Sequence, residues 1–522
     1  MKFRVVDGPW QVDRASVDVI FLWNTKWDDW FQYSTLYTLQ YIDPSGQSHR
    51  LGDVKIGQVS LQGARVGEAK LGERKPELAE EFTALSTRYF SVGQDDSYYE
   101  TLNELGDEFR VGILSGLRDI AYDEKARAIA LEERVTTTSL LRSVTMKTVE
   151  DQFARMAHGG KRLTPYKFTF IPKSDEPKPK LEFSVVPGSR PPSNIHVLIG
   201  RNGVGKSTLL NDLARTMVNK SRKEKPDPGP WDQLSNIVSV SFSAFDHFKP
   251  MSVPQERPRG LSYHYVGLKK VAPSSKDENS NKDAPAIKAE MTRSLKLCLV
   301  GARRARLRHA LSILESDPIF AEAGLAEILH APLDGDSQMP GLSIEADEAI
   351  AIFGKLFGRL SSGHKIVLLS IAKLVETVEA NSLVLLDEPE AHLHPPLLSA
   401  FVRTLSDLLT NRNGMAVIAT HSPVVLQEVP KDCVWKLTRS GNNLRVERPR
   451  VETFGENVGL LTDEVFGLEV TATGFHRMLT DAAMAARTYE EALSTFEGKL
   501  GSEGRSILRA MMISKANDHV GS

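Results

Sequence analysis

A glycine-rich segment with a single lysine is the clearest chemical feature of the chain. Gly200–Ser207 reads Gly-Arg-Asn-Gly-Val-Gly-Lys-Ser and fits the pattern G-x-x-x-x-G-K-[ST] between a predicted strand and a predicted helix. Glycines let backbone N–H groups curl around phosphate oxygens, and the N-terminus of the following helix adds partial positive charge. We therefore predict that this segment, the phosphate loop, binds ATP through the residues Asn202, Gly203, Val204, Gly205, Lys206, Ser207 and Thr208.

Two side chains of the phosphate loop add chemistry of their own. The Lys206 ammonium can neutralise the β- and γ-phosphate oxygens, which makes it a candidate catalytic residue, and the Ser207 hydroxyl can join the ligands of a Mg²⁺ ion. A chance glycine loop is the alternative, but it does not explain why the segment follows a strand and precedes a helix. We therefore expect ATP and Mg²⁺ as cofactors.

An apolar run that ends in two carboxylates supplies the second half of such a site. Ser382–Glu388 reads as a strand buried on both faces. At its end Asp387 is placed to hold Mg²⁺, and Glu388 to polarise an attacking water as a general base. A solvated acidic turn is the alternative. His392 and His394 follow; they are possible metal ligands, although a contact loop across a dimer explains them better.

A short serine- and glycine-rich loop lies 24 residues before Asp387. Leu360–His364 reads Leu-Ser-Ser-Gly-His and precedes a predicted helix, Lys365–Glu379. Ordinary helix capping would explain these residues in isolation. Their position before the Asp-Glu strand instead predicts a second binder of the γ-phosphate, formed by Ser361, Ser362 and Gly363. This signature loop cannot reach the phosphates held by its own chain, so it implies a head-to-tail homodimer or higher homo-oligomer.

A histidine ends the next predicted strand. His421 follows the apolar run Val417–Thr420, 33 residues after Glu388. A histidine in such a place is often a plain surface or core residue. Here the preceding Asp-Glu strand favours a side chain that hydrogen-bonds the γ-phosphate and senses its presence.

These segments need a common framework to bring them together. From the strand Ile195–Ile199 to about Leu437, predicted strands alternate with helices, which indicates an α/β sheet with parallel strands. We expect an ATPase head over residues 159–445, with a helical insertion at about 250–355 that includes a polar loop, Ser274–Asp283, and a helix, Leu295–Leu314.

The two ends of the chain differ from this head. We expect an α+β accessory domain over residues 1–158, with a β-hairpin around Asp43–Gly46 and helices over Pro76–Tyr89, Ser97–Ile120 and Val144–Ala157. Trp10, Trp23, Trp27 and Trp30 fall in the first 30 residues, and the aromatic residues at 23–41 form either a small core packed with Trp and Tyr or a partner-binding face. Residues 446–522 predict a helical C-terminal segment, with helices over Asn457–Phe466, Thr473–Arg487 and Tyr489–Met512.

Composition limits the classes of protein that fit. The 522 residues carry a net charge of −2, so nothing in the overall charge favours nucleic acid or an anionic membrane. Two cysteines, Cys298 and Cys433, suit a reducing compartment. Neither a signal peptide nor an apolar stretch long enough for a bilayer is evident, so we expect a cytoplasmic protein without a membrane partner.

Together these residues resemble the ABC-ATPase superfamily over about Phe168–Leu437. In this resemblance Gly200–Ser207 is Walker A, Leu360–His364 the signature, Asp387 and Glu388 the end of Walker B, and His421 the switch histidine. The segments 387–395 and 420–423 resemble soluble AAA_21-like ATPases grouped with OLD-type and SMC/RecF-like proteins. The tail, Glu452–Glu456 and Asp463–Gly467, resembles ATPase subunits of bacterial anti-phage systems such as Septu, in which the ATPase partners an HNH nuclease.

The chain also departs from its apparent relatives. No glutamine occupies the strand Val238–Phe248 after Walker A, where Ser241, Ser243 and Asp246 stand instead. Long heptad arms are absent, unlike in SMC rods. No acidic cluster follows His421, unlike in the nuclease domain of OLD proteins, so we do not expect this chain to be a nuclease.

Two functions therefore remain open on the sequence. The first is a regulatory ATPase whose dimer licenses a separate effector, a nuclease, in anti-phage defence. The second is a DNA-binding clamp for repair or recombination, in which Arg303–Arg308 and Lys220–Lys225 contact phosphates. A transporter subunit fits poorly, because no familiar coupling surface is present.

Overall fold

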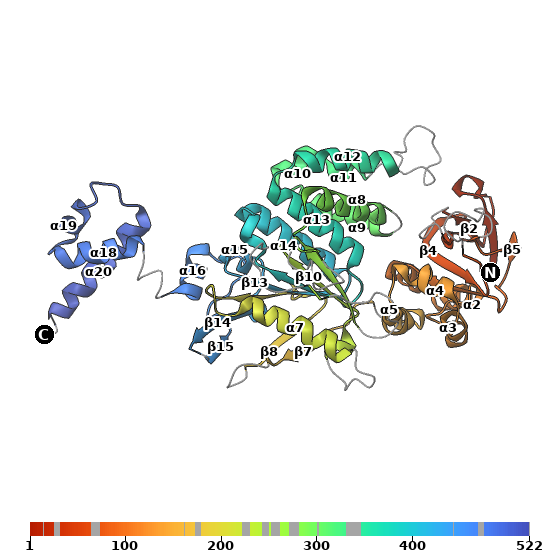
Figure 1. Ribbon diagram of the computed structural model, residues 1–522, viewed down its shortest axis with the longest axis horizontal. Coiled ribbons are helices and arrows are strands. Elements are labelled where there is room, and N and C mark those ends of the chain that lie inside the picture. The colour runs from red at the N-terminus through yellow and green to blue at the C-terminus, as the bar shows by residue number, and fades with distance from the viewer. Residues whose placement is uncertain are drawn as a thin grey trace.

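The computed structural model describes residues 1–13, 15–25, 32–63, 74–160, 162–172, 179–221, 230–242, 250–251, 261–270, 281–299, 302–329, 346–441, 443–467 and 474–520. Some of the predictions fall outside these residues. They concern Trp27, Trp30, Ser243, Asp246, most of Lys220–Lys225 and most of the polar loop Ser274–Asp283. Figure 1 shows the N-terminal region at the right, a central sheet with its helices in the middle and the C-terminal helices at the left.

A six-stranded sheet organises the described part of the N-terminal region, residues 1–157, in the order β5-β1-β2-β3-β4-β6. Its strands are β1 Lys2–Val6, β2 Val19–Asn24, β3 Leu36–Ile42, β4 Ser48–Gln58, β5 Glu81–Phe82 and β6 Tyr89–Gly93. β3 and β4 pair antiparallel around Asp43–Gly46, which confirms the predicted hairpin. The Asp43 carboxylate accepts hydrogen bonds from the amides of Ser45 and Gln47, both at 2.9 Å, and so fixes the turn.

Helices pack on this sheet and share one apolar core with it. They are α1 Asp96–Glu104, α2 Asp107–Gly116, α3 Glu124–Leu131, α4 Arg134–Thr138, α5 Met146–Thr148, the π-helical turn η4 Val149–Phe153 and α6 Ala154–Ala157. The helix predicted over Pro76–Tyr89 is wrong, because β5 lies inside this segment and pairs with β1. The helix predicted over Ser97–Ile120 is divided at Gly106, whose positive φ of 106° a helix cannot include.

The central sheet has seven strands among the described residues, in the order β11-β10-β12-β13-β9-β14-β15. They are β9 Ile195–Ile199, β10 Asn236–Ser241, β11 Ser262–Gly267, β12 Leu383–Asp387, β13 Met415–Thr420, β14 Val434–Ser440 and β15 Asn443–Glu447. Only β14 and β15 pair antiparallel; the other neighbours are parallel, as the alternation of strands and helices predicted. The carboxyl ends of the parallel strands therefore meet at one edge, where open α/β sheets bind their ligands.

Both faces of the central sheet are covered, which explains why its strands read as continuous apolar runs. Val384 and Leu386 of β12 face one core, whereas Leu383 and Leu385 face the other. Figure 1 shows the two covering layers on opposite sides of the sheet. On one side lie α13 Ser362–Thr377 and α14 Pro395–Thr410, and on the other lie α7 Lys206–Ser221 and the hairpin β7 Tyr166–Phe170 and β8 Leu181–Val185.

The helical insertion packs on α13 and α14 through the first of these cores. Its helices are α8 Ala284–Cys298, α9 Ala302–Leu314, α10 Pro318–Ala323, α11 Leu325–Ile328 and α12 Ala346–Arg359. The helix predicted over Leu295–Leu314 is therefore divided between α8 and α9. Asp317 begins α10 as its N-cap, because its carboxylate accepts hydrogen bonds from the amides of Ile319 and Phe320.

Buried charges join the N-terminal region to the central sheet. Arg412, which follows α14, lies 3.2 Å from the Asp95 carboxylate and 2.5 Å from that of Asp96. Arg306 of α9 reaches Asp95 at 3.2 Å, and Arg162 reaches Asp96 at 2.8 Å. Burial acts to raise the pKa of Asp95, but the Arg306 and Arg412 guanidinium groups overcome it and hold the pKa well below its ordinary value.

A second polar contact lies at the C-terminal end of α13. The Glu379 carboxylate accepts hydrogen bonds from the hydroxyl groups of Thr145 at 2.9 Å and Thr148 at 2.8 Å. Thr145 caps α5, so this carboxylate holds the start of that helix. Because the signature loop lies at the other end of α13, one helix connects the signature loop with the N-terminal region.

The chain beyond β15 is helical. α15 Pro423–Leu426 contacts α16 Val458–Phe466, whereas α18 Phe475–Ala485, α19 Tyr489–Ser494 and α20 Ser502–Val520 share a small core of their own (Figure 1). The helix predicted over Tyr489–Met512 is divided between α19 and α20. None of the helices in the described ranges combines the length and apolarity needed to cross a membrane.

Candidate functional site

The phosphate loop connects β9 to α7, as predicted. Gly203 and Gly205 have positive φ angles of 79° and 105°, which side chains with a Cβ adopt at a cost. No heavy atom lies within 4 Å of the position that a Cβ at Gly203 would occupy, so a ligand has room there. Asn202 and Thr208 are exposed, whereas Val204 is buried and its carbonyl accepts a hydrogen bond from Arg439 Nε at 3.0 Å.

Lys206 lies back on its own loop. Its Nζ donates hydrogen bonds to the carbonyl oxygens of Gly200 at 3.0 Å and Arg201 at 3.1 Å, and the residue is 4% exposed. Burial lowers the pKa of the ammonium, and the carboxylates of Glu388, Glu390 and Asp387 oppose this shift. A buried cation without a carboxylate in direct contact suits an anionic ligand such as a nucleotide phosphate.

Ser207 and Asp387 are in contact across the edge of the sheet. The Ser207 hydroxyl donates to Asp387 Oδ1 at 2.9 Å. The contact arises because β12 pairs with β13, and β13 pairs with β9, so that Asp387 lies beside the start of α7. A hydroxyl and a carboxylate at this separation are oxygen donors of the kind that Mg²⁺ takes, and they fit the ion that a nucleotide brings.

Glu388 follows Asp387 in a strained backbone conformation. Its φ and ψ angles are 46° and 58°, in the left-handed region that residues other than glycine seldom adopt. Its amide donates to the Ala419 carbonyl at 2.9 Å, which keeps the residue at the strand end. Such strain often occurs at functional positions.

Glu390, which the sequence did not single out, connects the Asp-Glu strand to His421. It lies in the 3-10 turn η6 Pro389–His392, and its side chain is 8% exposed. Its Oε1 accepts from the Thr420 hydroxyl at 2.6 Å and the His421 amide at 2.7 Å, and it lies 3.1 Å from His421 Nδ1. The available signal was a carboxylate two residues after Glu388, together with a threonine that ends the neighbouring strand.

The signature loop begins α13 and packs on the turn after Glu388. The Ser361 hydroxyl caps the helix by accepting from the amide of His364 and lies 2.7 Å from His364 Nδ1. Only glycine fits at position 363 without a steric clash, because a Cβ there would lie 2.4 Å from the His392 carbonyl oxygen. Ser362 is exposed in the first turn of α13. The glycine of the signature thus permits close contact between two functional segments.

The strand after the phosphate loop ends beside Asp387. Ser241 of β10 pairs in register with Asp387 of β12, so the end of β10 borders the site. Ser243 and Asp246, the other residues considered in place of a glutamine, lie outside the described residues.

Comparisons with known proteins identify relatives of this chain. The chain is 38% identical over 534 residues to protein ea59 of Escherichia phage lambda, and the match covers 99% of both chains. The chain belongs to the ea59 family. Residues 353–427 of this ea59-family chain match the AAA_21 family model, described as "AAA domain, putative AbiEii toxin, Type IV TA system".

Two solved structures are also similar to this ea59-family chain. They are an ATP-binding cassette of an ABC transporter in its ADP conformation (15% identity, TM-score 0.28, 59% of this chain and 98% of that chain) and a nucleotide-free cassette of an ABC transporter (14%, 0.28, 60% and 100%). The AAA_21 match spans the signature loop, Asp387, Glu388 and His421. The ea59-family chain is thus a mixed α/β protein in which the central sheet carries the AAA-domain match and a second sheet lies in the N-terminal region.

Proposed function

We propose that the chain hydrolyses ATP at the edge of the central sheet, with Glu388 as the general base, Lys206 and His421 as γ-phosphate contacts, and Ser207 and Asp387 as Mg²⁺ ligands. The contact of Ser207 with Asp387, beside Glu388, carries this proposal, because it joins the phosphate loop to the carboxylates. When bound, Mg²⁺ would neutralise negative charge on the phosphate oxygens. Glu388 directly follows the end of β12, and its carboxylate would take a proton from the attacking water molecule.

We propose further that two chains act head to tail. The Ser361–Gly363 turn would meet the γ-phosphate held by the partner subunit's phosphate loop. The N-terminus of α13 supports this arrangement, because it offers backbone amides and an exposed Ser362. The residue bounds 1–158, 159–445 and 446–522 remain our division of the chain into an accessory domain, an ATPase head and a C-terminal segment.

The dimer would act as a switch for a separate effector, which we propose is a nuclease in anti-phage defence. The description of the AAA_21 family names a toxin, and the ea59 relative is encoded by a phage. Defence encoded by a phage would act against competing phages. The alternative, a DNA clamp, has lost part of its support: Arg303 donates to Ser143, and Arg306 pairs with Asp95, so neither is free for nucleic acid.

The deciding experiment exchanges subunits. Lys206→Ala damages the phosphate loop, and Ser362→Glu places a negative charge where the partner's γ-phosphate would dock. Each variant alone should hydrolyse little ATP, whereas a mixture should recover activity, because mixed dimers contain one intact composite site. A mixture as inactive as its components would contradict the head-to-tail arrangement.

Glu388→Gln tests the chemistry separately. It should still bind ATP but release no phosphate, and it should elute as a dimer with ATP in size-exclusion chromatography. Glu322→Gln, on the exposed surface of α10, is the matched control and should behave as the unmodified protein. Unchanged phosphate release by Glu388→Gln would refute the role of Glu388.

A further inference from the structure

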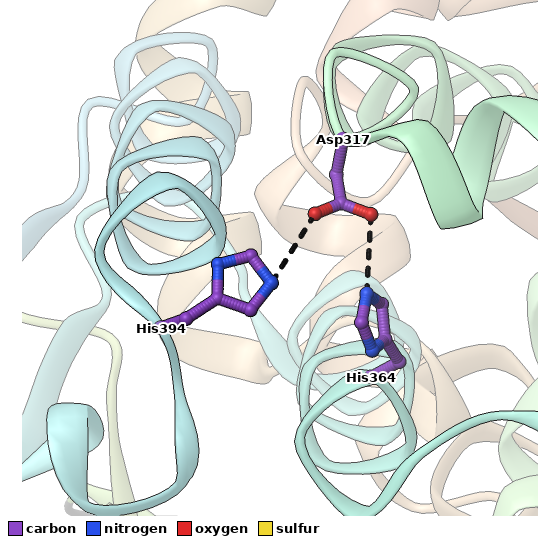
Figure 2. A group of neighbouring side chains, drawn as sticks. All are labelled: Asp317, His364 and His394. Atoms are coloured by element: carbon purple, nitrogen blue, oxygen red, sulfur yellow. Dashed lines mark hydrogen bonds and ion pairs between the residues drawn. The ribbon is translucent and has the colours of Figure 1, made fainter.

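Three potential metal ligands converge where the signature loop meets the helical insertion. Figure 2 shows Asp317 between His364 and His394, with one carboxylate oxygen turned to each ring. His364 Nε2 lies 3.1 Å from Asp317 Oδ1, and His394 Nε2 lies 3.7 Å from Oδ2. All three ligand atoms lie within 4.8 Å of one another. The residues come from three separate segments, so the fold and not local sequence creates the cluster.

The surroundings hold two of the ligands firmly. The side chains of Asp317 and His364 are 2% and 3% exposed. Asp317 Oδ1 also accepts from the Ile319 amide at 3.0 Å, and Phe320 packs edge-on against the His364 ring. Ser361 Oγ lies 2.7 Å from His364 Nδ1, and a proton on Nδ1 donated to this oxygen would leave Nε2 unprotonated and directed at the cluster. Such partners commonly orient metal-binding histidines.

We propose that Asp317, His364 and His394 bind a divalent transition-metal ion of the zinc class. Two imidazoles and one carboxylate favour Zn²⁺ and its neighbours over Mg²⁺, which prefers oxygen alone. In a tetrahedral zinc site the ligand atoms are about 3.3 Å apart, given bonds of about 2.0 Å. The observed separations of 3.1 and 3.7 Å, each measured to a different oxygen of Asp317, lie near this value, and a small rotation of the exposed His394 side chain would bring the three ligand atoms onto one ion. His394 is 51% exposed, so the fourth position opens to solvent and can hold water.

Binding would change one existing contact. His394 Nδ1 now accepts the Leu397 amide at 3.3 Å as the N-cap of α14. Coordination through Nε2 places the ring proton on Nδ1 and so replaces this long capping bond. The metal bonds outweigh it, because the loss is a single long hydrogen bond at the end of one helix.

The ion would fasten three segments together: the start of α10 in the insertion, the start of α13 with its signature loop, and the segment that leads from Glu388 into α14. Occupancy would therefore fix the signature loop relative to the insertion. The site is separate from the Mg²⁺ position at Ser207 and Asp387, and its existence does not depend on ATP hydrolysis.

The test uses the full-length protein, freed of metal by a chelator and kept without nucleotide. Co²⁺ is the first probe, because it replaces Zn²⁺ and its visible absorption reports nitrogen and oxygen ligands in tetrahedral geometry; Zn²⁺ affinity is then measured by calorimetry. We expect one ion per chain and an affinity at least about tenfold weaker in Asp317→Asn and in His394→Asn. Asparagine supplies a side-chain oxygen that can cap the helix at either position, and circular dichroism checks that both variants fold.

His392→Asn is the matched control, because His392 lies two residues from His394, is exposed and belongs to no such cluster in the described chain. It should bind Co²⁺ as the unmodified protein does. Absence of Co²⁺ binding by the unmodified protein would overturn the proposal, and the cluster would then be a hydrogen-bonded contact alone. If Asp317→Asn and His394→Asn bound Co²⁺ as tightly as the unmodified protein, the ion would lie elsewhere and the proposal would be overturned. The same holds if His392→Asn lost as much affinity as these two variants.

Discussion

Glu390 Oε1 accepts the backbone amide of His421 at 2.7 Å and lies 3.1 Å from the Nδ1 atom of the same residue. A single carboxylate oxygen thus fixes both the main chain and the ring of the histidine at the end of β13. We propose that the Nε2 atom contacts the γ-phosphate. Orientation of His421 is therefore set by a residue on the neighbouring turn and not by its own strand.

Replacing Glu390 should impair turnover more than binding. In Glu390→Ala the His421 ring loses its charged partner, and we expect kcat for ATP to fall by about tenfold or more, equivalent to about 1.4 kcal/mol, with ATP affinity nearly unchanged. Phosphate release and nucleotide binding measure the two effects. His392→Ala, in the same turn but exposed, is the control. An unchanged kcat would show that His421 does not need Glu390.

Lys206→Ala should act on binding itself. The ammonium is buried against the carbonyl oxygens of its own loop, where we propose that the nucleotide phosphates bind. Loss of a charged hydrogen-bonding partner should weaken ATP binding by about 10- to 100-fold. Fluorescent nucleotide titration checks this, with Arg215→Ala on the exposed face of α7 as control. Equal affinities in the two variants would remove Lys206 from the site.

Arg412→Met should destabilise the whole chain. The substitution leaves Asp95 and Asp96 buried with less positive charge, which typically costs about 3–5 kcal/mol. Arg308→Met on α9 is exposed and should cost little. Urea denaturation followed by tryptophan fluorescence compares the two. If Arg412→Met is as stable as Arg308→Met, the buried ion pairs do not hold the N-terminal region in place.

Acid should destabilise the central sheet through His196. This residue of β9 is fully buried, and burial lowers the pKa of its imidazole from 6.5 to about 4. Because the folded-state pKa is depressed, unfolding takes up a proton below about pH 6.5, and the stability is lost as the pH falls towards 4. Between pH 7 and pH 5 the loss should be about 2 kcal/mol.

The His196→Gln variant should lose less stability over this pH range, because glutamine does not titrate. Denaturation curves at several pH values measure the difference in slope. The exposed His158 provides a control, since His158→Gln should leave the slope as it is. Parallel curves for the unmodified protein and His196→Gln would contradict the buried, neutral state of this histidine.

The sequence predicted the parts of the fold that local pattern determines. Continuous apolar runs predicted β9, β12 and β13, and Asp43–Gly46 predicted the hairpin, because strand burial and turn chemistry are visible within a few residues. Segments whose structure depends on a distant partner were not predictable in this way. Pro76–Tyr89 reads as helical but contains β5, which exists because β1 is available for pairing.

In the candidate site, too, the sequence predicted what local spacing determines but not the contacts between distant segments. The phosphate loop has a recognisable spacing, whereas Glu390 matters only because η6 brings it to Thr420, 30 residues away. Asp317 and His364 meet across 47 residues and a stretch of insertion that no periodicity relates to the signature. Arg303 and Arg306 of α9, which belong to a run that resembles a phosphate-binding segment in sequence, are turned towards Ser143 and Asp95 by tertiary packing.

The placement of α13 has a mechanical consequence. Its 16 residues span about 24 Å, with Ser361 at the start and Glu379, bonded to Thr145 and Thr148, just beyond the end. The helix thus joins the signature loop directly to a contact with the N-terminal region. In a head-to-tail dimer, the N-terminal region of one subunit would therefore respond to the nucleotide bound by the partner subunit.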